Sequence, residues 1–200
     1  MKYYAVIDFE CTCNGDWDFP NEIIEFPAVL IHPLTLVAEF EFRRFVKPTE
    51  NPVLLPYCTD LTGIKQGDVD EANELGEVLE EFSTFLEDNE LEIMLVTDGP
   101  WDVDKFLVPE CRRKGLAIPR WSKQWLDIRK KFAKCLELES WLNLSGMLVV
   151  LGLEFEGREH SGIDDSRNIA KILVELINRG FKTSKHNRSL KAFHNDVFTI

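Results

Sequence analysis

The sequence lacks any apolar run that approaches the ~20 residues a membrane-spanning helix requires. It also lacks internal repeats and low-complexity tracts, and its first residues, MKYYAVIDFE, show no signal-peptide pattern. We therefore expect no membrane partner and an intracellular location, cytoplasmic and/or nuclear. With 200 residues, 44% of them hydrophobic and 29% charged, the composition is typical of one soluble globular domain.

Cysteine is scarce and odd in number, which argues against a disulfide framework. The five residues are Cys11, Cys13, Cys58, Cys111 and Cys135. Their spacing matches no framework pattern, which favours a reducing compartment. The Cys11-x-Cys13 pair resembles half of a zinc site, but no second pair of Cys or His at ligand spacing accompanies it. Structural thiols are the favoured interpretation.

Positive charge is also in short supply. The sequence has 23 Lys and Arg against 35 Asp and Glu, a formal net charge of −12. This balance argues against non-specific binding to nucleic acid, because phosphate affinity usually comes from Lys and Arg. It does not exclude a nuclease, since carboxylates that hold divalent cations reverse the local charge and attract phosphate. The basic clusters at 112–114 and 129–131 and the lysines of the tail are interpreted as solvated surface.

The sequence does contain a succession of apolar and amphipathic segments. Three predicted strands come first, and strands and helices then alternate, which predicts an α/β domain with a mixed sheet and helices on its faces. The predicted strands lie at residues 3–9, 23–32, 35–48 and 93–99. The predicted helices lie at 71–89, from Trp101 to about Arg113, at 140–153 and at 161–180, with a helical turn at 57–64 and a strand followed by a helix within 121–137.

Acidic residues stand at the ends of these predicted elements. Asp8 and Glu10 follow an apolar stretch, two residues apart, so on a strand both side chains point to the same face. Two carboxylates that close repel each other, and removing them from water is costly unless a cation meets them. Asp102 follows the predicted strand at 93–99. His160 and Asp165 lie around the start of the last long helix.

Carboxylates from one strand end and two helix starts can converge at one edge of a sheet, where sites in α/β proteins form. Hard oxygen ligands of this kind suit Mg²⁺ or Mn²⁺ rather than zinc. Two such ions roughly 4 Å apart stabilise both the attacking and the leaving oxygen of a phosphoryl displacement. A histidine beside them can accept the proton of the attacking water.

Each of these residues also has an ordinary structural interpretation. Asp165 near a helix start is commonly a cap or a dipole partner, and Asp98 or Asp102 can cap the helix that follows it. His160, which comes after Arg158-Glu159, is by itself typical of a solvated loop. The joint occurrence of these residues in this order favours a functional site.

The motifs and their order resemble a known family. The segments that carry the resemblance are DFECTC, EIIEFPAVLI, YCTDLTGI, WDVDKFL, KQWLDIRKKF and HSGIDDSRNIAKIL. Together they are similar to the DEDDh family of 3′→5′ exonucleases, and within it to the branch of enhanced-RNAi and histone-mRNA 3′-end exonucleases that includes the Snipper-type enzymes. The resemblance covers residues 3–181, the expected exonuclease domain, and leaves 182–200 as a polar C-terminal tail of unclear structure.

The resemblance implies a ribonuclease-H-like fold with a five-stranded mixed sheet flanked by helices. It implies a site for Mg²⁺ or Mn²⁺, two ions per active site. The residues implied to bind the ions are Asp8, Glu10, Asp102 and Asp165. His160 is the implied general base, so that Glu10 and His160 are the expected catalytic residues. The implied enzyme is a hydrolase that cuts the terminal phosphodiester at a free 3′ end of RNA and/or DNA and releases nucleoside 5′-monophosphates.

By the same resemblance, one group of residues is expected to contact the terminal nucleotide. The group comprises Glu10, the backbone at Cys11, Leu61, Thr62, Gly63, Ile64, Trp101 and His160. The family more often has Ala where Cys11 stands, and a backbone contact tolerates that change. Trp101 is expected to stack on the base, an interaction that contributes about 1–3 kcal/mol. A position in the core is the alternative for Trp101.

Two other functions compete with the exonuclease. In a haloacid-dehalogenase-like phosphatase an aspartate nucleophile follows the first strand, and DFECT, Thr97 and GIDD mimic parts of that pattern. That mechanism needs an aspartate where Glu10 stands, and it gives His160 no role. A non-catalytic binding protein on a nuclease fold is expected to have lost a ligand, whereas all five positions are present here. No feature of the sequence indicates a particular protein partner.

Overall fold

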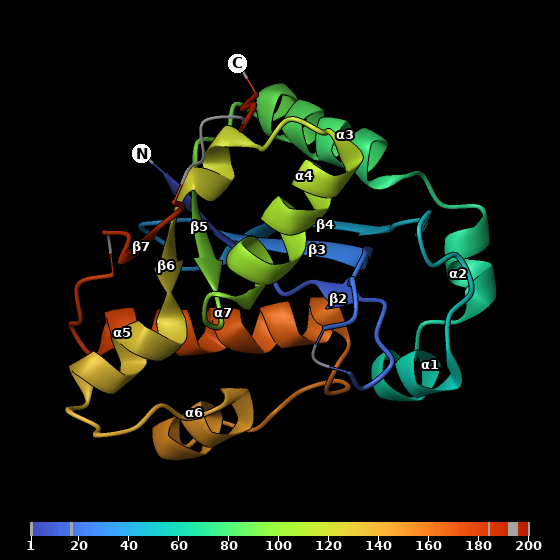
Figure 1. Cartoon of the computed structure of the whole chain (residues 1–200). Coiled ribbons are helices and arrows are strands. Elements are labelled where there is room, and N and C mark those ends of the chain that lie inside the picture. Colours follow the sequence, from blue (N-terminus) through green and yellow to red (C-terminus); the bar gives the residue numbers. More distant parts are fainter. Residues whose placement is uncertain (1, 17, 184, 192–195, 200) are drawn as a thin grey trace.

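The structure, a computed structural model, describes residues 2–16, 18–183, 185–191 and 196–199. One mixed sheet forms its centre, and helices cover both faces (Figure 1). The strands are β1 (Tyr3–Val6), β2 (Glu10–Cys11), β3 (Ile23–Ile31), β4 (Ala38–Phe45), β5 (Ile93–Thr97), β6 (Gln124–Asp127) and β7 (Arg188–Ser189). β3 pairs with β1, β2 and β4, and from β1 the sheet continues through β5 and β6 to β7.

Helices follow the strands in the alternation that the sequence predicts. They are α1 (Pro56–Thr62), α2 (Gln66–Asp70), α3 (Leu75–Asp88), η1 (Asp102–Leu107), α4 (Val108–Lys114), η2 (Arg120–Lys123), α5 (Ile128–Cys135), α6 (Leu144–Leu151) and α7 (Gly162–Asn178). The short α2 is an addition to the predicted elements. Within the described part of the chain, no helix combines the length and the apolar character needed to cross a bilayer.

The predicted mixed sheet is confirmed, with two short strands added. Five strands have four or more residues, whereas β2 and β7 have two residues each. β1, β5 and β6 are parallel, and β3 runs antiparallel to both β1 and β4. These directions follow from the connections, because a tight turn joins β3 to β4 and helical segments separate β5 from β6.

β1 and β2 form one interrupted strand beside β3. Val6 pairs with Val29 and Glu10 pairs with Glu25, so both segments keep the same register along one edge of β3. Asp8 lies in the gap between them. The predicted first strand is therefore broken at the position of its first carboxylate.

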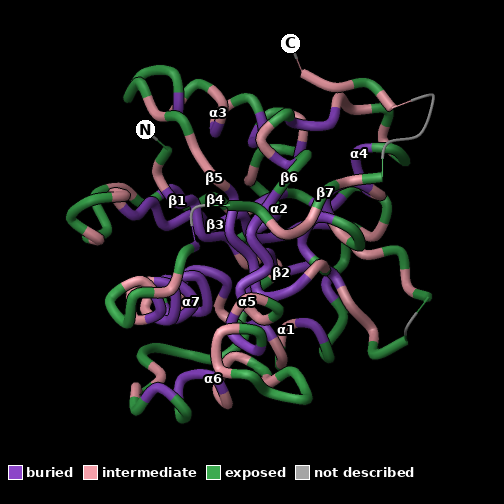
Figure 2. Tube along the Cα trace, turned by 90° about the vertical axis from the view of Figure 1, so that its left-hand side faces the viewer, coloured by how far each residue is buried: buried purple, intermediate pink, exposed green. Residues whose placement is uncertain are grey.

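Alternate side chains of β1 enter two different cores. Ala5 packs on the side that α3 and α4 cover, whereas Tyr4 and Val6 pack on the side of α5, α6 and α7. In Figure 1, α3 and α4 lie above the sheet and α6 and α7 lie below it. All nine residues of β3 are buried, and Figure 2 shows the strands within a buried centre. The sheet is therefore a rigid middle layer whose edge can hold a site.

The amphipathic helix predicted over 71–89 is confirmed as α3. Its apolar side chains are all buried, and they are Leu75, Val78, Leu79, Phe82 and Leu86. Phe82 packs against Phe26 of β3 with 4.9 Å between the ring centroids. Burial of one apolar stripe on a helix is the packing that the 3.6-residue period predicts.

The described parts of the C-terminal tail contact the sheet. β7 pairs antiparallel with β6, and Phe198 forms an isolated bridge with Ile118. The side chain of Asn187 exchanges two hydrogen bonds with the backbone of Asp127, at 2.8 and 3.0 Å. The tail therefore extends the sheet at β6. The domain boundary at residue 181 stays a prediction.

Candidate active site

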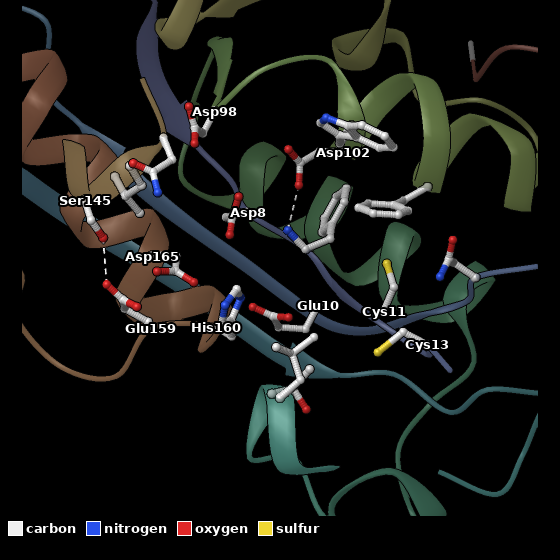
Figure 3. Close-up of a pocket in the computed structure, with 18 of the residues that line it drawn as sticks. Asp8, Glu10, Cys11, Cys13, Asp98, Asp102, Ser145, Glu159, His160 and Asp165 are labelled. Atoms are coloured by element: carbon white, nitrogen blue, oxygen red, sulfur yellow. Dashed lines mark hydrogen bonds between the residues drawn. The ribbon is translucent and has the colours of Figure 1, made fainter. Parts of the chain in front are cut away.

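Three carboxylates meet at one edge of the sheet. Asp8 follows β1, Glu10 begins β2 and Asp165 lies in the first turn of α7. One oxygen of each lies within 4.8 Å of the others, and Figure 3 shows the side chains directed toward a common space. That space is part of a cavity of about 390 Å³ that all three residues line. The structure thus brings together three of the four carboxylates expected to share cations.

Asp102, the fourth carboxylate, lines the same cavity but is not part of the group of three. It opens η1, which is a π-helix, a rare conformation that is frequent at functional sites. Asp102 is 3% exposed, and its Oδ1 accepts a hydrogen bond of 2.8 Å from the backbone N–H of Phe9. Because Phe9 lies between Asp8 and Glu10, this bond fixes Asp102 relative to both of them (Figure 3).

A buried glutamate on β3 holds the start of α7 in place. The carboxylate of Glu25 accepts hydrogen bonds from the backbone N–H groups of Gly162 and Ile163, at 3.2 and 3.3 Å. Arg43 on β4 forms an ion pair of 2.8 Å with the same carboxylate. A negative charge at a helix N-terminus is favourable because the free N–H groups there carry partial positive charge. Glu25 therefore anchors the helix that carries Asp165.

Burial and crowding raise the pKa of the cavity carboxyls. Burial raises the pKa of Glu10 to about 9, and the charges of Asp165 and Glu25 add to the shift. Burial raises the pKa of Asp165 and the pKa of Asp102 to about 7 each. It raises the pKa of Asp8 well above its usual range, and the charge of Asp102 adds to this shift.

Each of the four carboxyls therefore binds a proton more readily than a free carboxyl does when no cation is bound. A divalent cation replaces such protons and removes the repulsion between the ionised groups. The donor atoms are all carboxylate oxygens, which suits a hard divalent cation. Donor chemistry and raised pKa together indicate that these residues fit a divalent-cation site.

Cys11 and Cys13 line the cavity but are not among the residues that converge on the candidate cation site. Among the described residues, the group of ligands close enough to share one ion consists of carboxylates alone. All five cysteines are free thiols, and three of them are buried. The zinc interpretation of the Cys11-x-Cys13 pair therefore has no support in the structure, and the interpretation as structural thiols agrees with it.

His160 lies in the loop before α7, and Figure 3 shows its ring beside Glu10. It lines the cavity and is exposed to solvent. Its φ of +60° is in the left-handed region, which non-glycine residues rarely adopt. Its carbonyl oxygen accepts a hydrogen bond of 3.2 Å from Arg158. An imidazole at this position can exchange a proton with water in the cavity.

The predicted nucleotide-contacting residues divide into two sets. Cys11, Leu61, Thr62 and Trp101 line the cavity, as Glu10 and His160 do. Trp101 is 39% exposed, so it is not a core residue. A side chain at the rim of the cavity is available for stacking, and the role of this set stays a prediction.

Gly63 and Ile64 lie outside the cavity lining. Gly63 ends α1 with φ +76°, a conformation that favours glycine. Ile64 is 4% exposed and packs in a small separate core with Leu54 and Val69. These positions indicate that both residues have a structural role, in addition to the nucleotide contact expected of them.

Sequence reasoning missed an ion pair in the wall of the cavity. Asp98 accepts hydrogen bonds from Nε and Nη2 of Arg129, at 3.0 and 2.5 Å, and both residues line the cavity. The interpretation of Asp98 as a helix cap and of Arg129 as solvated surface is therefore corrected. The available signal was that Asp98 directly follows a strand parallel to β1, because the carboxyl ends of parallel strands share one edge of a sheet.

In the basic cluster at 112–114, Arg112 and Arg113 are exposed, as the solvated-surface interpretation predicts, whereas Lys114 is not. The Nζ of Lys114 lies 2.9 Å from Glu22 and 2.7 Å from Glu110, and both glutamates are fully buried. Arg113 pairs with Glu50 at 3.0 Å. Lys114 therefore neutralises two buried carboxylates, each of which requires a partner, whereas the pair of Arg113 and Glu50 lies at the surface.

A mixed sheet between helices, with an acidic cavity at its edge, is the arrangement of a nuclease domain. Comparison with known sequences identifies the family. The chain matches the RNase_T family, described as Exonuclease, over residues 5–173, and it belongs to that family. Membership confirms the resemblance to the DEDDh exonucleases and the ribonuclease-H-like fold. It also removes the haloacid-dehalogenase-like phosphatase from consideration.

Individual relatives are exoribonucleases by name. The chain is 40% identical over 185 residues to 3'-5' exoribonuclease 1 of Mus musculus, an alignment that covers 89% of this chain and 54% of the relative. It is 38% identical over 191 residues to ERI1 exoribonuclease 3 of Homo sapiens, covering 92% of this chain and 57% of the relative. The chain thus spans about half the length of the curated relatives it matches.

A solved structure agrees with the fold over nearly the whole chain. The nuclease domain of 3'hExo, a DEDDh family member bound to rAMP, superposes with a TM-score of 0.91 and 38% sequence identity. The match covers 94% of this chain and 98% of that domain. The described fold is therefore that of a DEDDh nuclease domain.

Proposed function

We propose that this protein is a metal-dependent 3′→5′ exonuclease that shortens RNA from a free 3′ end and releases nucleoside 5′-monophosphates. The observation that carries the proposal is the convergence of three carboxylates within 4.8 Å in a cavity of a DEDDh-type fold. The names of the relatives support RNA as the substrate. DNA with a free 3′ end is the alternative substrate.

The cavity carboxylates are the proposed ligands of two ions, Mg²⁺ or Mn²⁺. Asp8, Glu10 and Asp165 converge in the site, and Asp102 lines the same cavity. Bound divalent ions would supply positive charge that stabilises the attacking and leaving oxygens of the phosphodiester. The Phe9 N–H that holds Asp102 and the Glu25 carboxylate that holds α7 keep the ligand carboxylates at defined positions.

His160 is the proposed general base. Its imidazole is exposed at the cavity and lies beside Glu10, where it can accept a proton from a water molecule that approaches the scissile phosphate (Figure 3). Exposure to solvent lets the imidazole release that proton before the next cycle. Glu10 is the second proposed catalytic residue, since its carboxylate adjoins the other ligands and His160.

Leu61, Thr62, Trp101 and the backbone at Cys11 are the proposed contacts of the terminal nucleotide. They line the cavity on the side of α1 and η1. A half-exposed indole can stack on any base, which suits an enzyme that removes nucleotides one after another without reading sequence. The five free thiols support an intracellular location, cytoplasmic and/or nuclear.

The test uses RNA and DNA oligonucleotides of one sequence, labelled at the 5′ end and incubated with Mg²⁺ or with Mn²⁺. We expect a ladder of products that shortens from the 3′ end, release of 5′-monophosphates and a faster reaction on RNA. Asp165→Asn is the matched control, because it keeps the side-chain volume and removes the charge. Intact oligonucleotides in the wild-type reactions, or equal activity in the Asp165→Asn variant, would reject the proposal.

A further inference from the structure

We propose that Arg158 is a positioning residue that holds His160 at the cavity and links it to the nucleotide-contacting end of α1. The inference rests on the proposed exonuclease function, because it concerns the general base of that reaction. Arg158 does not line the cavity itself, so it acts through the residues that it contacts.

The guanidinium of Arg158 bridges two segments that are far apart in the sequence. Its Nη1 donates hydrogen bonds to the carbonyl oxygens of Glu159 and His160, at 3.3 and 3.2 Å. Its Nη2 donates to the carbonyl oxygen of Asp60, at 3.0 Å, in the last turns of α1. A planar guanidinium can serve several acceptors at once, which the single ammonium of lysine does less well.

His160 requires such support because of its backbone conformation. At φ +60° its Cβ approaches the following carbonyl, so the conformation is disfavoured for any residue other than glycine. Its carbonyl oxygen accepts the hydrogen bond from Arg158, which restrains the peptide that follows it. Without the bond to Arg158, His160 can relax to negative φ, and this rotation would turn its imidazole away from Glu10.

The loop that carries Arg158 is built tightly against α7. Gly157 has φ +91°, and a Cβ there would lie 2.4 Å from the Cγ of Asp164. The carboxylate of Asp164 accepts a hydrogen bond of 3.0 Å from the backbone N–H of Arg158. On the other flank, Glu159 accepts a bond of 2.6 Å from Ser145 of α6 (Figure 3). The backbone at Arg158 is therefore held in place, so that its side chain can position the residues that follow.

The turn after α1 is shaped around the same guanidinium. A Cβ at Gly63 would lie 3.0 Å from the Cζ of Arg158, tighter than ordinary side-chain contacts. Leu61 and Thr62, which line the cavity, directly precede this turn. The lack of a side chain at Gly63 thus lets Arg158 join the wall of the cavity to the loop of the general base.

The experiment compares Arg158→Ala and Arg158→Lys with wild type in kcat and KM on a 5′-labelled RNA. Arg179→Ala is the control, because Arg179 is a surface arginine near the far end of α7 that pairs with Glu175. We expect Arg158→Ala to lower kcat by roughly 10-fold to 100-fold, the effect of a small misplacement of a catalytic group. Arg158→Lys should recover part of the loss, and Arg179→Ala should match wild type. Melting temperature and Mn²⁺ affinity of the Arg158 variants should stay close to the wild-type values.

A double-mutant cycle with His160→Ala tests whether Arg158 acts through His160. We expect Arg158→Ala to change kcat less than twofold in the His160→Ala background. An equal loss in both backgrounds, or a change confined to KM, would overturn the inference, because Arg158 would then act on the fold or on the RNA.

A crystal structure of the Arg158→Ala variant provides a readout that is independent of activity. His160 should leave the left-handed region in it. If His160 keeps its φ near +60° and its place beside Glu10, the inference is wrong even if the proposed nuclease activity is absent. An inactive wild-type enzyme would in turn reject the proposed function, not the contact between Arg158 and His160.

Discussion

Gly162, the first residue of α7, lies directly against the main-chain carbonyl of Asp8. A Cβ at position 162 would lie 2.5 Å from that oxygen and 3.1 Å from the ring of Pro27. The end of β1 and the start of α7 are therefore closer than any side chain at 162 permits. This approach brings Asp165, one turn further along α7, to the carboxylates of Asp8 and Glu10.

Gly162→Ala should therefore damage both stability and activity. The added methyl group meets a backbone atom, which cannot move without displacing the helix. We expect destabilisation by about 1–3 kcal/mol, typical of overpacking, and a loss of most nuclease activity because Asp165 moves with the helix. Urea denaturation and the RNA assay measure the two effects.

Gly67→Ala is the matched control for this substitution. Gly67 lies in α2, and a Cβ there would meet nothing within 4 Å. The same change at this position should leave activity intact and keep or slightly raise stability, because alanine favours helix more than glycine does. If Gly162→Ala behaves like Gly67→Ala, the close approach of β1 and α7 is not required for the site.

The metal-free protein should lose stability as the pH rises. Folding raises the pKa of Asp102 and Asp165 to about 7 and that of Glu10 to about 9, whereas carboxyls of an unfolded chain titrate near about 4. Between these limits the folded state binds more protons than the unfolded state, so its free energy of unfolding falls with rising pH. The stabilisation is complete below about pH 4 and is lost through about pH 9. Melting curves in chelator at pH 5, 7 and 9 test this.

Asp8→Asn tests whether repulsion between the cavity carboxylates causes this loss of stability. The variant removes one carboxylate whose charge adds to the crowding, so it should be more stable than wild type at pH 8 without metal. Mg²⁺ should raise the melting temperature of wild type more than that of the variant. A variant that melts below wild type at pH 8 without metal would show that repulsion is not the dominant effect.

His160→Ala should lower kcat by roughly 10²–10⁴-fold, the usual contribution of general acid–base catalysis. The imidazole is exposed and does not belong to the group of converging metal-ligand candidates, so Mn²⁺ binding should persist. Isothermal titration with Mn²⁺ and single-turnover kinetics measure the two properties separately. Unchanged kcat would remove His160 from the mechanism.

Chelation should abolish nuclease activity, and Mg²⁺ or Mn²⁺ should restore it. The reason is that six acidic residues line the cavity, and divalent cations bound among them would supply the positive charge that attracts the phosphate of the substrate. The measurement is the rate of RNA shortening in excess EDTA and after addition of each ion. Zn²⁺ serves as the comparison ion, since the converging ligand atoms are carboxylate oxygens and include no thiolate. Full activity in EDTA would contradict the metal assignment.

Sequence patterns predicted the regular elements because these depend on local spacing. The apolar stripe of α3 and the apolar run of β3 each identify an element without reference to the rest of the chain. β7 was missed because a two-residue strand exists only through its pairing with β6. The π-helical conformation of η1 could not be predicted either, because the spacing of apolar side chains does not reveal its hydrogen-bond pattern.

In the candidate site, too, the sequence predicts residue types but not contacts between distant segments. Residue types in a recognisable order identified Asp8, Glu10, Asp102, His160 and Asp165, because the affinity of carboxylates for hard cations is a property of the side chain itself. The roles of Arg129 and Arg158 could not be predicted, because their partners are distant in the sequence. Their partners, Asp98 and Asp60, lie 31 and 98 residues away, and no spacing rule connects them.

The sequence by itself thus determined the available chemistry: a set of acidic side chains, a histidine, and the order of elements that a DEDDh exonuclease domain requires. Only the tertiary structure decided which oxygens meet within 4.8 Å, which carboxyls have a raised pKa and which arginine holds the histidine loop. The physical reason is that ligand preference belongs to a single side chain. Proximity, burial and the resulting pKa shifts arise only when distant segments pack together.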